Sequence, residues 1–188
     1  MTSEPPYISI VRAAESITLK DGDWAEFGTA KGVSLKIMYD LIPDDAHLHL
    51  FDSFEGLPED WLDANGVIFL PKGKFKTTPP EWIFKKPRIV VHKGMFNDTI
   101  PTFAKEQQKP LSFIHIDCDL YSSTKTIFDN INKLIVKGTI ICFDEFFSYR
   151  GWEVHEFKAF HEYIDKYSRK YKYLGRTQSE KAWLKITE

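Results

Sequence analysis

The stretch FIHIDCDLYSST, residues 113–124, decides the fold because it joins a strand-like apolar run to two acids. Residues 111–116 form a short apolar run of the kind expected for a buried strand. Asp117 and Asp119 follow it directly, and a Ser-Ser-Thr sequence then indicates the start of a helix. The sequence therefore predicts a core strand that ends in carboxylates.

A second apolar run, residues 139–143, ends in the same way at Asp144 and Glu145. If the two strands are neighbours in a parallel sheet, four carboxylates meet at its carboxyl edge, where open α/β sheets bind their ligands. Four anions in one site require a cation, unless some of them are protonated. These residues are therefore the first candidates for a metal or acid-base site.

Composition limits the class of protein. A chain of 188 residues is long enough for one domain with a substantial core, so we expect a single domain over residues 1–188. The net charge of -2, with no run dominated by Lys and Arg, argues against nucleic-acid binding. No apolar stretch has the length of a membrane span or of a signal-peptide core, and Cys118 and Cys142 are expected to be buried, reduced thiols. We therefore expect a cytoplasmic protein that binds no membrane.

Residues 24–32 read as a strand followed by a glycine-containing loop, and residues 33–41 as the helix behind it. A strand, a glycine turn and a helix form the first half of a nucleotide-type binding unit, in which the backbone approaches the ligand closely. The loop lacks the GxGxxG spacing, which makes NAD the weaker candidate. Glu26, at the end of the strand, is a candidate to attract a cationic ligand group.

The second strand, residues 47–52, ends in Asp52 and Ser53. An acid at this position holds ribose hydroxyls in Rossmann-like domains, because its carboxylate can accept from both vicinal hydroxyls. A third strand over residues 88–92 precedes Met95 and Phe96, which we expect to flank a flat base.

The remaining segments complete the predicted fold. Apolar spacing predicts an amphipathic N-terminal helix over residues 7–20. Residues 59–87 form an irregular, Gly- and Pro-punctuated insertion with scattered aromatic residues, which makes them a candidate acceptor-binding loop. Residues 152–167 have helical spacing, and residues 172–176 and 182–186 alternate like the strands of an antiparallel hairpin. The alternation of strands and helices predicts an α/β fold, with a mostly parallel sheet and helices on both faces.

Six blocks of sequence, in order along the chain, resemble the macrocin O-methyltransferase family of class I S-adenosylmethionine-dependent methyltransferases. The blocks are EFGTAKGVS at 26–34, FDSFEGLPE at 51–59, KGMFNDTIP at 93–101, HIDCDLYSSTK at 115–125, FDEFF at 143–147 and GWEVHEFKAF at 151–160. The resemblance runs from about residue 21 to the C-terminus and implies a Rossmann-like, seven-stranded sheet whose last strand is antiparallel.

The resemblance also implies a site. Glu26, Gly28 and Thr29 would line the methionine end of S-adenosylmethionine, Asp52 with Ser53 would take the ribose hydroxyls, and Met95 and Phe96 would border the adenine. Mg²⁺ would be held by Asp117, Asp144 and Glu145, where a third Asp is usual in the family. Asp117 also belongs to the predicted cofactor edge.

Asp119 matches the acid that looks like the general base of the family. It is two residues from Asp117 and is therefore expected on the same strand face. The predicted reaction is methyl transfer to a hydroxyl of a sugar or another small molecule with vicinal hydroxyls, with a small-molecule or glycan acceptor as the partner. Two alternatives stay open, a nicotinamide-dependent oxidoreductase and a catalytically inactive methyltransferase-like binding module, and homo-oligomerisation is also left open.

Overall fold

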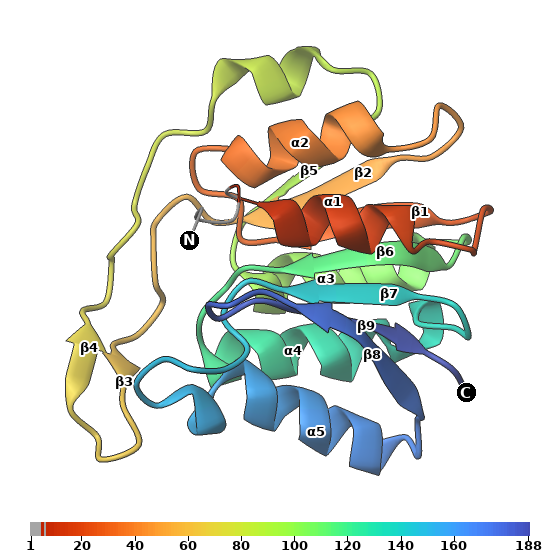
Figure 1. The fold of residues 1–188 in the computed structure, drawn as a ribbon. Coiled ribbons are helices and arrows are strands. Elements are labelled where there is room, and N and C mark those ends of the chain that lie inside the picture. Colours follow the sequence, from red (N-terminus) through yellow and green to blue (C-terminus); the bar gives the residue numbers. More distant parts are fainter. Residues whose placement is uncertain (1–4, 6) are drawn as a thin grey trace.

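Seven strands form one sheet in the described chain, which comprises residues 5 and 7–188 of the computed structural model (Figure 1). The strands are β1 (Asp23–Phe27), β2 (Leu48–Asp52), β5 (Ile89–Lys93), β6 (Leu111–Ile116), β7 (Ile140–Phe143), β8 (Tyr171–Arg176) and β9 (Ala182–Ile186). Their order is β5-β2-β1-β6-β7-β9-β8. Neighbours from β5 to β7 are parallel, whereas β9 runs antiparallel to both β7 and β8. The predicted mostly parallel sheet with an antiparallel C-terminal hairpin is confirmed.

The central strands are rich in apolar residues and are covered on both faces of the sheet. Every residue of β1 and of β6 is buried. Parallel strands covered on both faces have this pattern, because successive side chains enter opposite halves of the core. In β6, Phe113 belongs to the apolar cluster on one face of the sheet and Ile114 to the cluster on the other.

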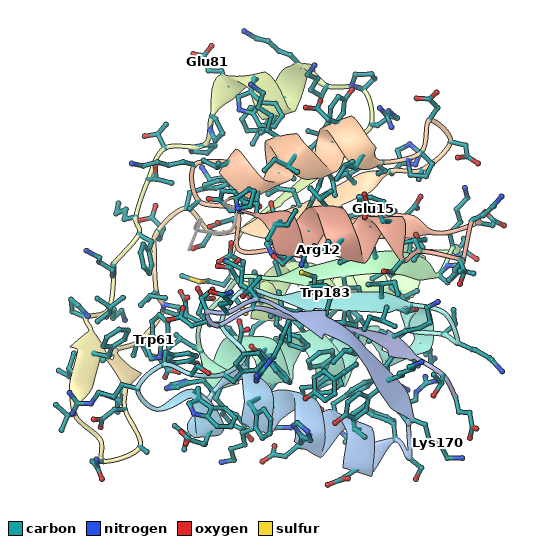
Figure 2. All side chains as sticks on the ribbon, in the orientation of Figure 1. Arg12, Glu15, Trp61, Glu81, Lys170 and Trp183 are labelled. Atoms are coloured by element: carbon teal, nitrogen blue, oxygen red, sulfur yellow. The ribbon has the colours of Figure 1, made fainter. Side chains whose placement is uncertain are left out.

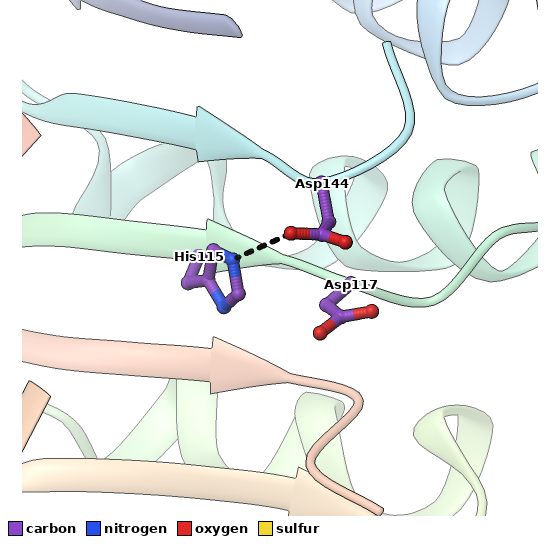
Figure 3. Close-up of side chains that lie close together, drawn as sticks. All are labelled: His115, Asp117 and Asp144. Atoms are coloured by element: carbon purple, nitrogen blue, oxygen red, sulfur yellow. Dashed lines mark ion pairs between the residues drawn. The ribbon is translucent and has the colours of Figure 1, made fainter. Parts of the chain in front are cut away.

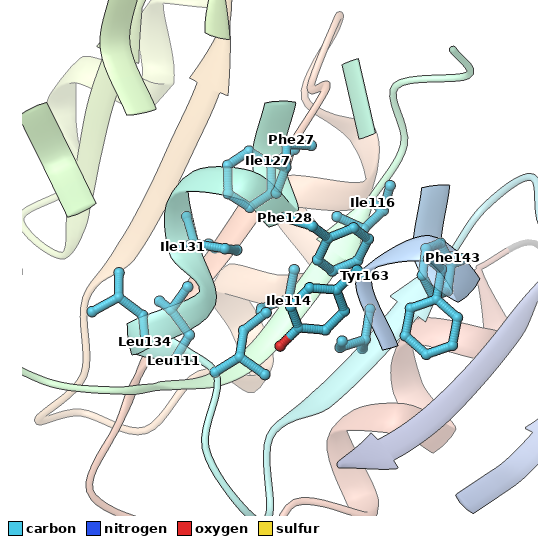
Figure 4. Close-up of a cluster of buried hydrophobic side chains, with 14 of the residues drawn as sticks. Phe27, Leu111, Ile114, Ile116, Ile127, Phe128, Ile131, Leu134, Phe143 and Tyr163 are labelled. Carbon is cyan, nitrogen blue, oxygen red and sulfur yellow. The ribbon is translucent and has the colours of Figure 1, made fainter. Parts of the chain in front are cut away.

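Helices cover both faces, as predicted. They are α1 (Ile8–Glu15), α2 (Val33–Leu41), α3 (Phe96–Glu106), α4 (Tyr121–Ile131) and α5 (Glu156–Lys166). Side chains of α1 and α2 join one apolar cluster and side chains of α3, α4 and α5 the other, on the two sides of the sheet seen in Figure 1. Figure 4 shows the second cluster, in which Phe128 of α4 and Tyr163 of α5 stack with their ring centroids 4.6 Å apart.

The N-terminal helix is shorter than the predicted span of residues 7–20, because α1 ends at Glu15. The Ser16 hydroxyl donates to the carbonyl of Arg12 at 2.8 Å. The N–H groups of Ser16 and Ile17 each bond to the carbonyl three residues back, which tightens and ends the last turn. No helix in the described part of the chain is long and apolar enough to cross a membrane.

The insertion over residues 59–87 is more ordered than its sequence predicts. It contains a two-stranded antiparallel sheet, β3 (Trp61–Leu62) with β4 (Ile68–Leu70), and a 3-10 helix, η1 (Glu81–Lys85). Figure 1 shows the small sheet beyond the carboxyl ends of the main strands. Trp61, labelled in Figure 2, is buried and anchors it in a cluster with Leu57 and Leu120.

Candidate active site

A cavity of about 820 Å³ opens at the carboxyl edge of the parallel strands. Every predicted site residue except Glu26 lines it, namely Gly28, Thr29, Asp52, Ser53, Met95, Phe96, Asp117, Asp119, Asp144 and Glu145. These residues follow five different strands, and the strand order alone brings them together.

The glycine loop is fixed by its neighbours. Gly28 has a φ of +88°, and a Cβ built there would lie 1.7 Å from the carbonyl oxygen of Asp117. Asp52 accepts the N–H groups of Thr29 and Ala30 with one carboxylate oxygen, both at 2.8 Å, and that of Phe54 with the other at 2.6 Å. The Asp52 carboxylate therefore fixes the loop backbone before any ligand binds.

The side chains of Glu26 and Ser53 both make hydrogen bonds within the protein. Glu26 is fully buried, accepts from the Thr29 hydroxyl at 2.7 Å, and faces Nδ1 of His115 at 3.1 Å. The Ser53 hydroxyl accepts the N–H of Glu55 at 3.1 Å. Glu26 thus lies beneath the cavity, and its contact with the loop runs through Thr29.

Met95 and Phe96 lie where β5 leads into α3. Met95 is 39% exposed, so its side chain is free to contact a ligand. Phe96 packs edge-on against Phe27 with ring centroids 5.8 Å apart, which ties this wall of the cavity to the core.

The four carboxylates divide into two groups. Oxygens of Asp117, Asp119 and Glu145 lie within 4.8 Å of one another, and a second group of the same size joins Asp117 with Asp144 and His115 (Figure 3). Asp117 belongs to both groups. Two predicted metal ligands, Asp144 and Glu145, therefore fall in different groups that share Asp117, and Asp119, the predicted base, groups with Asp117 and Glu145.

Burial and mutual repulsion change how these acids titrate. Burial, with the charge of Asp144, raises the pKa of Asp117 well above its usual value and that of Asp119 to about 7. Burial and the charge of Asp117 raise the pKa of Glu145. Burial acts in the same direction on Asp144, but His115 and Lys181 outweigh it and lower the pKa. Asp144 is thus the charged member of the cluster.

Sequence reasoning missed the two bases beside Asp144. Among the described residues, Lys181 is the only Lys or Arg lining the cavity, and its Nζ pairs with Asp144. Nε2 of the fully buried His115 lies 3.9 Å from the same carboxylate, as the dashed line in Figure 3 shows. Burial alone would lower the pKa of His115, but its contacts with Asp144 and Glu26 raise it well above the usual value. His115 pairs with Glu26 across the sheet, and Ala182, the residue after Lys181, pairs with Phe143, so both bases reach Asp144 through strand registers that the local sequence does not specify.

Asp119 does not share a strand face with Asp117, which corrects the prediction. Strand β6 ends at Ile116, and Asp119 has a φ of +66°, so the two-residue alternation of a strand no longer applies. A loop conformation instead directs Asp119 to the cavity wall, where it is 8% exposed.

The donor set fits a hard divalent cation. Asp117 and Glu145 of the first group, two of the three predicted metal ligands, offer carboxylate oxygens, which Mg²⁺ and Ca²⁺ prefer. Oε2 of Glu145 is buried and has no hydrogen-bond partner among the described residues. A bound cation would satisfy that oxygen and offset the repulsion among the acids.

Comparison with known proteins gives a family and a fold. Residues 25–146 match a family model described as a methyltransferase domain. The calicheamicin methyltransferase CalS11 has a similar structure, with a TM-score of 0.72 and 21% identity over 94% of this chain and 75% of that one. The O-methyltransferase NovP follows, with a TM-score of 0.71 and 17% identity over 97% and 80% of the two chains. An O-methyltransferase from Bacillus cereus has a TM-score of 0.62 and 14% identity over 98% and 82%.

Curated protein sequences gave no significant match. The matched segment includes the glycine loop, Asp52 and all four clustered acids, so it spans the cavity as well as the core strands. The chain therefore belongs to the methyltransferase domain family and has the Rossmann-like fold of class I methyltransferases.

Proposed function

We propose that the protein is an S-adenosylmethionine-dependent O-methyltransferase acting on a sugar or another small molecule with vicinal hydroxyls. The observation that carries the proposal is the convergence of the glycine loop and four carboxylates on one cavity. The structural likeness to CalS11, described as a TDP-rhamnose 3'-O-methyltransferase, supports a sugar acceptor. The resemblance to the macrocin O-methyltransferase family points to the same chemistry.

The cofactor would lie along the glycine loop. When bound, S-adenosylmethionine supplies the activated methyl group. Gly28 and Thr29 would border its methionine end, Asp52 and Ser53 its ribose, and Met95 and Phe96 its adenine. Three of the Asp52 lone-pair positions already accept backbone N–H groups, which leaves about one for a ribose hydroxyl. Pre-formed hydrogen bonds of this kind reduce the ordering cost of binding.

Asp117, Asp144 and Glu145 would hold Mg²⁺, as the resemblance implies, with Asp117 the acid that belongs to both groups of ligand atoms. A cation bound there supplies Lewis acidity that lowers the pKa of a coordinated hydroxyl. Because Lys181 already pairs with Asp144, we expect Asp117 and Glu145 to contribute most of the affinity. The four acids and Lys181 would together orient the acceptor.

Asp119 would act as the general base. Burial raises its pKa, which makes the carboxylate a stronger base than an exposed Asp. As the acceptor oxygen gains the methyl group, its hydroxyl proton would pass to a carboxylate oxygen of Asp119, so the ether product forms without a net charge on the oxygen. The low exposure of Asp119 limits competing contact with water.

The insertion over residues 59–87 would recognise the acceptor. Glu59 and Phe75 from this segment line the cavity, and Glu59 accepts a hydrogen bond from the Ser122 hydroxyl next to the catalytic loop. These contacts bring the insertion within reach of a molecule bound beside Asp119.

Two measurements test the proposal. Calorimetry should detect S-adenosylmethionine binding, and a screen of sugars and catechol-like diols with and without Mg²⁺ should detect S-adenosylhomocysteine release. Asp119→Asn should lower kcat by about 10²- to 10⁴-fold, the usual contribution of a general base, and leave cofactor affinity within about twofold. Asp129→Asn, which removes an exposed carboxylate on α4, is the matched control and should retain full activity.

No cofactor binding in calorimetry would reject the methyltransferase function, and NADH binding in its place would favour the oxidoreductase alternative. Cofactor binding without release of S-adenosylhomocysteine from any acceptor would favour the inactive binding module. An Asp119→Asn variant with wild-type kcat would reject the assignment of the base.

A further inference from the structure

Glu156, the first residue of α5, is buried beneath the loop that carries Asp119. Its Oε1 accepts the backbone N–H groups of Cys118 at 3.3 Å and of Asp119 at 3.2 Å. Its Oε2 is buried and finds no partner in the described part of the chain. A carboxyl group kept in the core at that cost needs a role that an apolar side chain could not fill.

The backbone that Glu156 contacts has an unusual conformation. Asp119 has a φ of +66°, in the left-handed region that Asp enters more readily than most side chains but that still costs free energy relative to the common conformations. Without the Glu156 oxygen, two successive N–H groups in the interior would lose their acceptor, and the loop could relax toward a common conformation. That relaxation would turn the Asp119 carboxylate away from the cavity.

The preceding residue extends the contact to the insertion. Nδ1 of His155 accepts the N–H of Tyr121 at 3.3 Å, so Nε2 carries the proton and donates to the carbonyl of Leu62 at 2.6 Å. Leu62 belongs to β3, and the His155 ring also lies edge-on to Trp61 of the same strand. The end of the Asp119 loop is thus tied to the candidate acceptor segment.

We propose that Glu156 is a positioning residue that holds Asp119 in its left-handed conformation, and that His155 ties the same loop to the insertion. The inference rests on the proposed function in one respect, namely that Asp119 is the base. It assigns to the start of α5 the task of keeping the carboxylate directed at the acceptor. Glu156 does not line the cavity, so it would act only through Asp119.

Two substitutions separate the acceptor oxygen from the bulk of the side chain. Glu156→Leu keeps a side chain of similar size and removes the acceptor, whereas Glu156→Gln keeps an oxygen that can accept both N–H groups. We expect Glu156→Leu to lower kcat about 100-fold, as expected for a misplaced catalytic group, with cofactor Kd within about twofold. Glu156→Gln should recover most of that loss. Glu156→Asp, whose shorter arm withdraws the oxygen, should resemble the Leu variant and serves if that variant does not fold.

A double-mutant cycle tests whether Glu156 acts through Asp119. If it does, Glu156→Leu should lower kcat no further in an Asp119→Asn background, because the group it positions is already gone. Additive losses in the double variant would overturn the proposal, as would equal activity of the Leu and Gln variants.

Amide hydrogen exchange provides a readout that needs no acceptor. The N–H groups of Cys118 and Asp119 should be protected in the wild type and in Glu156→Gln, and should exchange faster in Glu156→Leu, with the amides of β1 unchanged. Equal protection in all three proteins would overturn the positioning role. If the expected exchange pattern is found in a protein that methylates nothing, the positioning role stands and the proposed function fails.

Discussion

Gly28→Ala is the substitution whose effects on stability and cofactor affinity the structure predicts most clearly. Gly28 combines a φ of +88° with a close approach to the loop after β6. A Cβ there would lie 1.7 Å from the carbonyl oxygen of Asp117, and contacts below 3.0 Å do not occur for real Cβ atoms. The cofactor loop or the Asp117 backbone must therefore move by more than an ångström.

The expected loss of folding free energy in Gly28→Ala has two parts. The left-handed conformation costs Ala about 1 kcal/mol, and overpacking against a backbone atom costs about 1–3 kcal/mol more. A total of about 2–4 kcal/mol corresponds to a fall in Tm of roughly 4–16 °C for a domain of this size. Because the displaced atoms belong to the cofactor loop, affinity for S-adenosylmethionine should fall at least tenfold, or about 1.4 kcal/mol.

Gly66→Ala is the matched control. Gly66 has a similar φ of +77°, but no described atom lies within 4 Å of the position of its Cβ. It should show only the backbone cost, a fall in Tm of roughly 2–4 °C, with unchanged cofactor affinity. Calorimetric unfolding and cofactor titration of the two variants in parallel check both numbers. Equal effects of the two substitutions would refute the importance of the close approach.

Two further predictions concern charge. Lys181→Met should lower the free energy of unfolding by about 1–2 kcal/mol in urea titrations, because the partly buried Asp144 carboxylate loses one of its two basic partners, and adding Asp144→Asn should recover part of the loss. A double variant less stable than Lys181→Met would contradict this. For His92, burial and the charge of His49 lower the pKa to about 4. At His92 the unfolded chain therefore binds more protons between pH 6.5 and 4, so this residue alone should contribute a loss of about 2–3 kcal/mol as pH falls through this range, while the raised acids of the cavity act in the opposite direction. His92→Phe, which keeps the stacking on Phe51, should reduce that loss relative to wild type, and identical pH profiles would count against it.

The sheet could be predicted because each strand has a local signal. The buried runs of β6 and β7 and the alternation of β8 and β9 are visible without tertiary information. The hairpin of β3 and β4 has no such signal. Two residues of β3 pair there because Trp61 is anchored against Leu57 and Leu120, a contact between distant parts of the chain.

Some residues of the candidate site can be predicted from the sequence and others cannot. Acids that end strands, such as Asp117 and Asp144, can be predicted once the strands are known, because parallel strands share one edge. Their partners cannot, since Lys181 and Glu156 lie on elements whose register and crossing are set by packing. The left-handed Asp119 is a further example, because its N–H is bound by Glu156 from a distant helix and the residue type alone does not fix its conformation.

The two groups of carboxylates show how the protein balances charge in the cavity. On one side, Asp144 is compensated by Lys181 and His115, so this half of the cluster is charged and stable without a ligand. On the other side, Asp117, Asp119 and Glu145 face one another with raised pKa values. Their repulsion is relieved either by protons or by a cation, and both are used in the proposed reaction. Repulsion among these three acids lowers the stability of the free protein. Binding a cation or taking up the hydroxyl proton removes that repulsion.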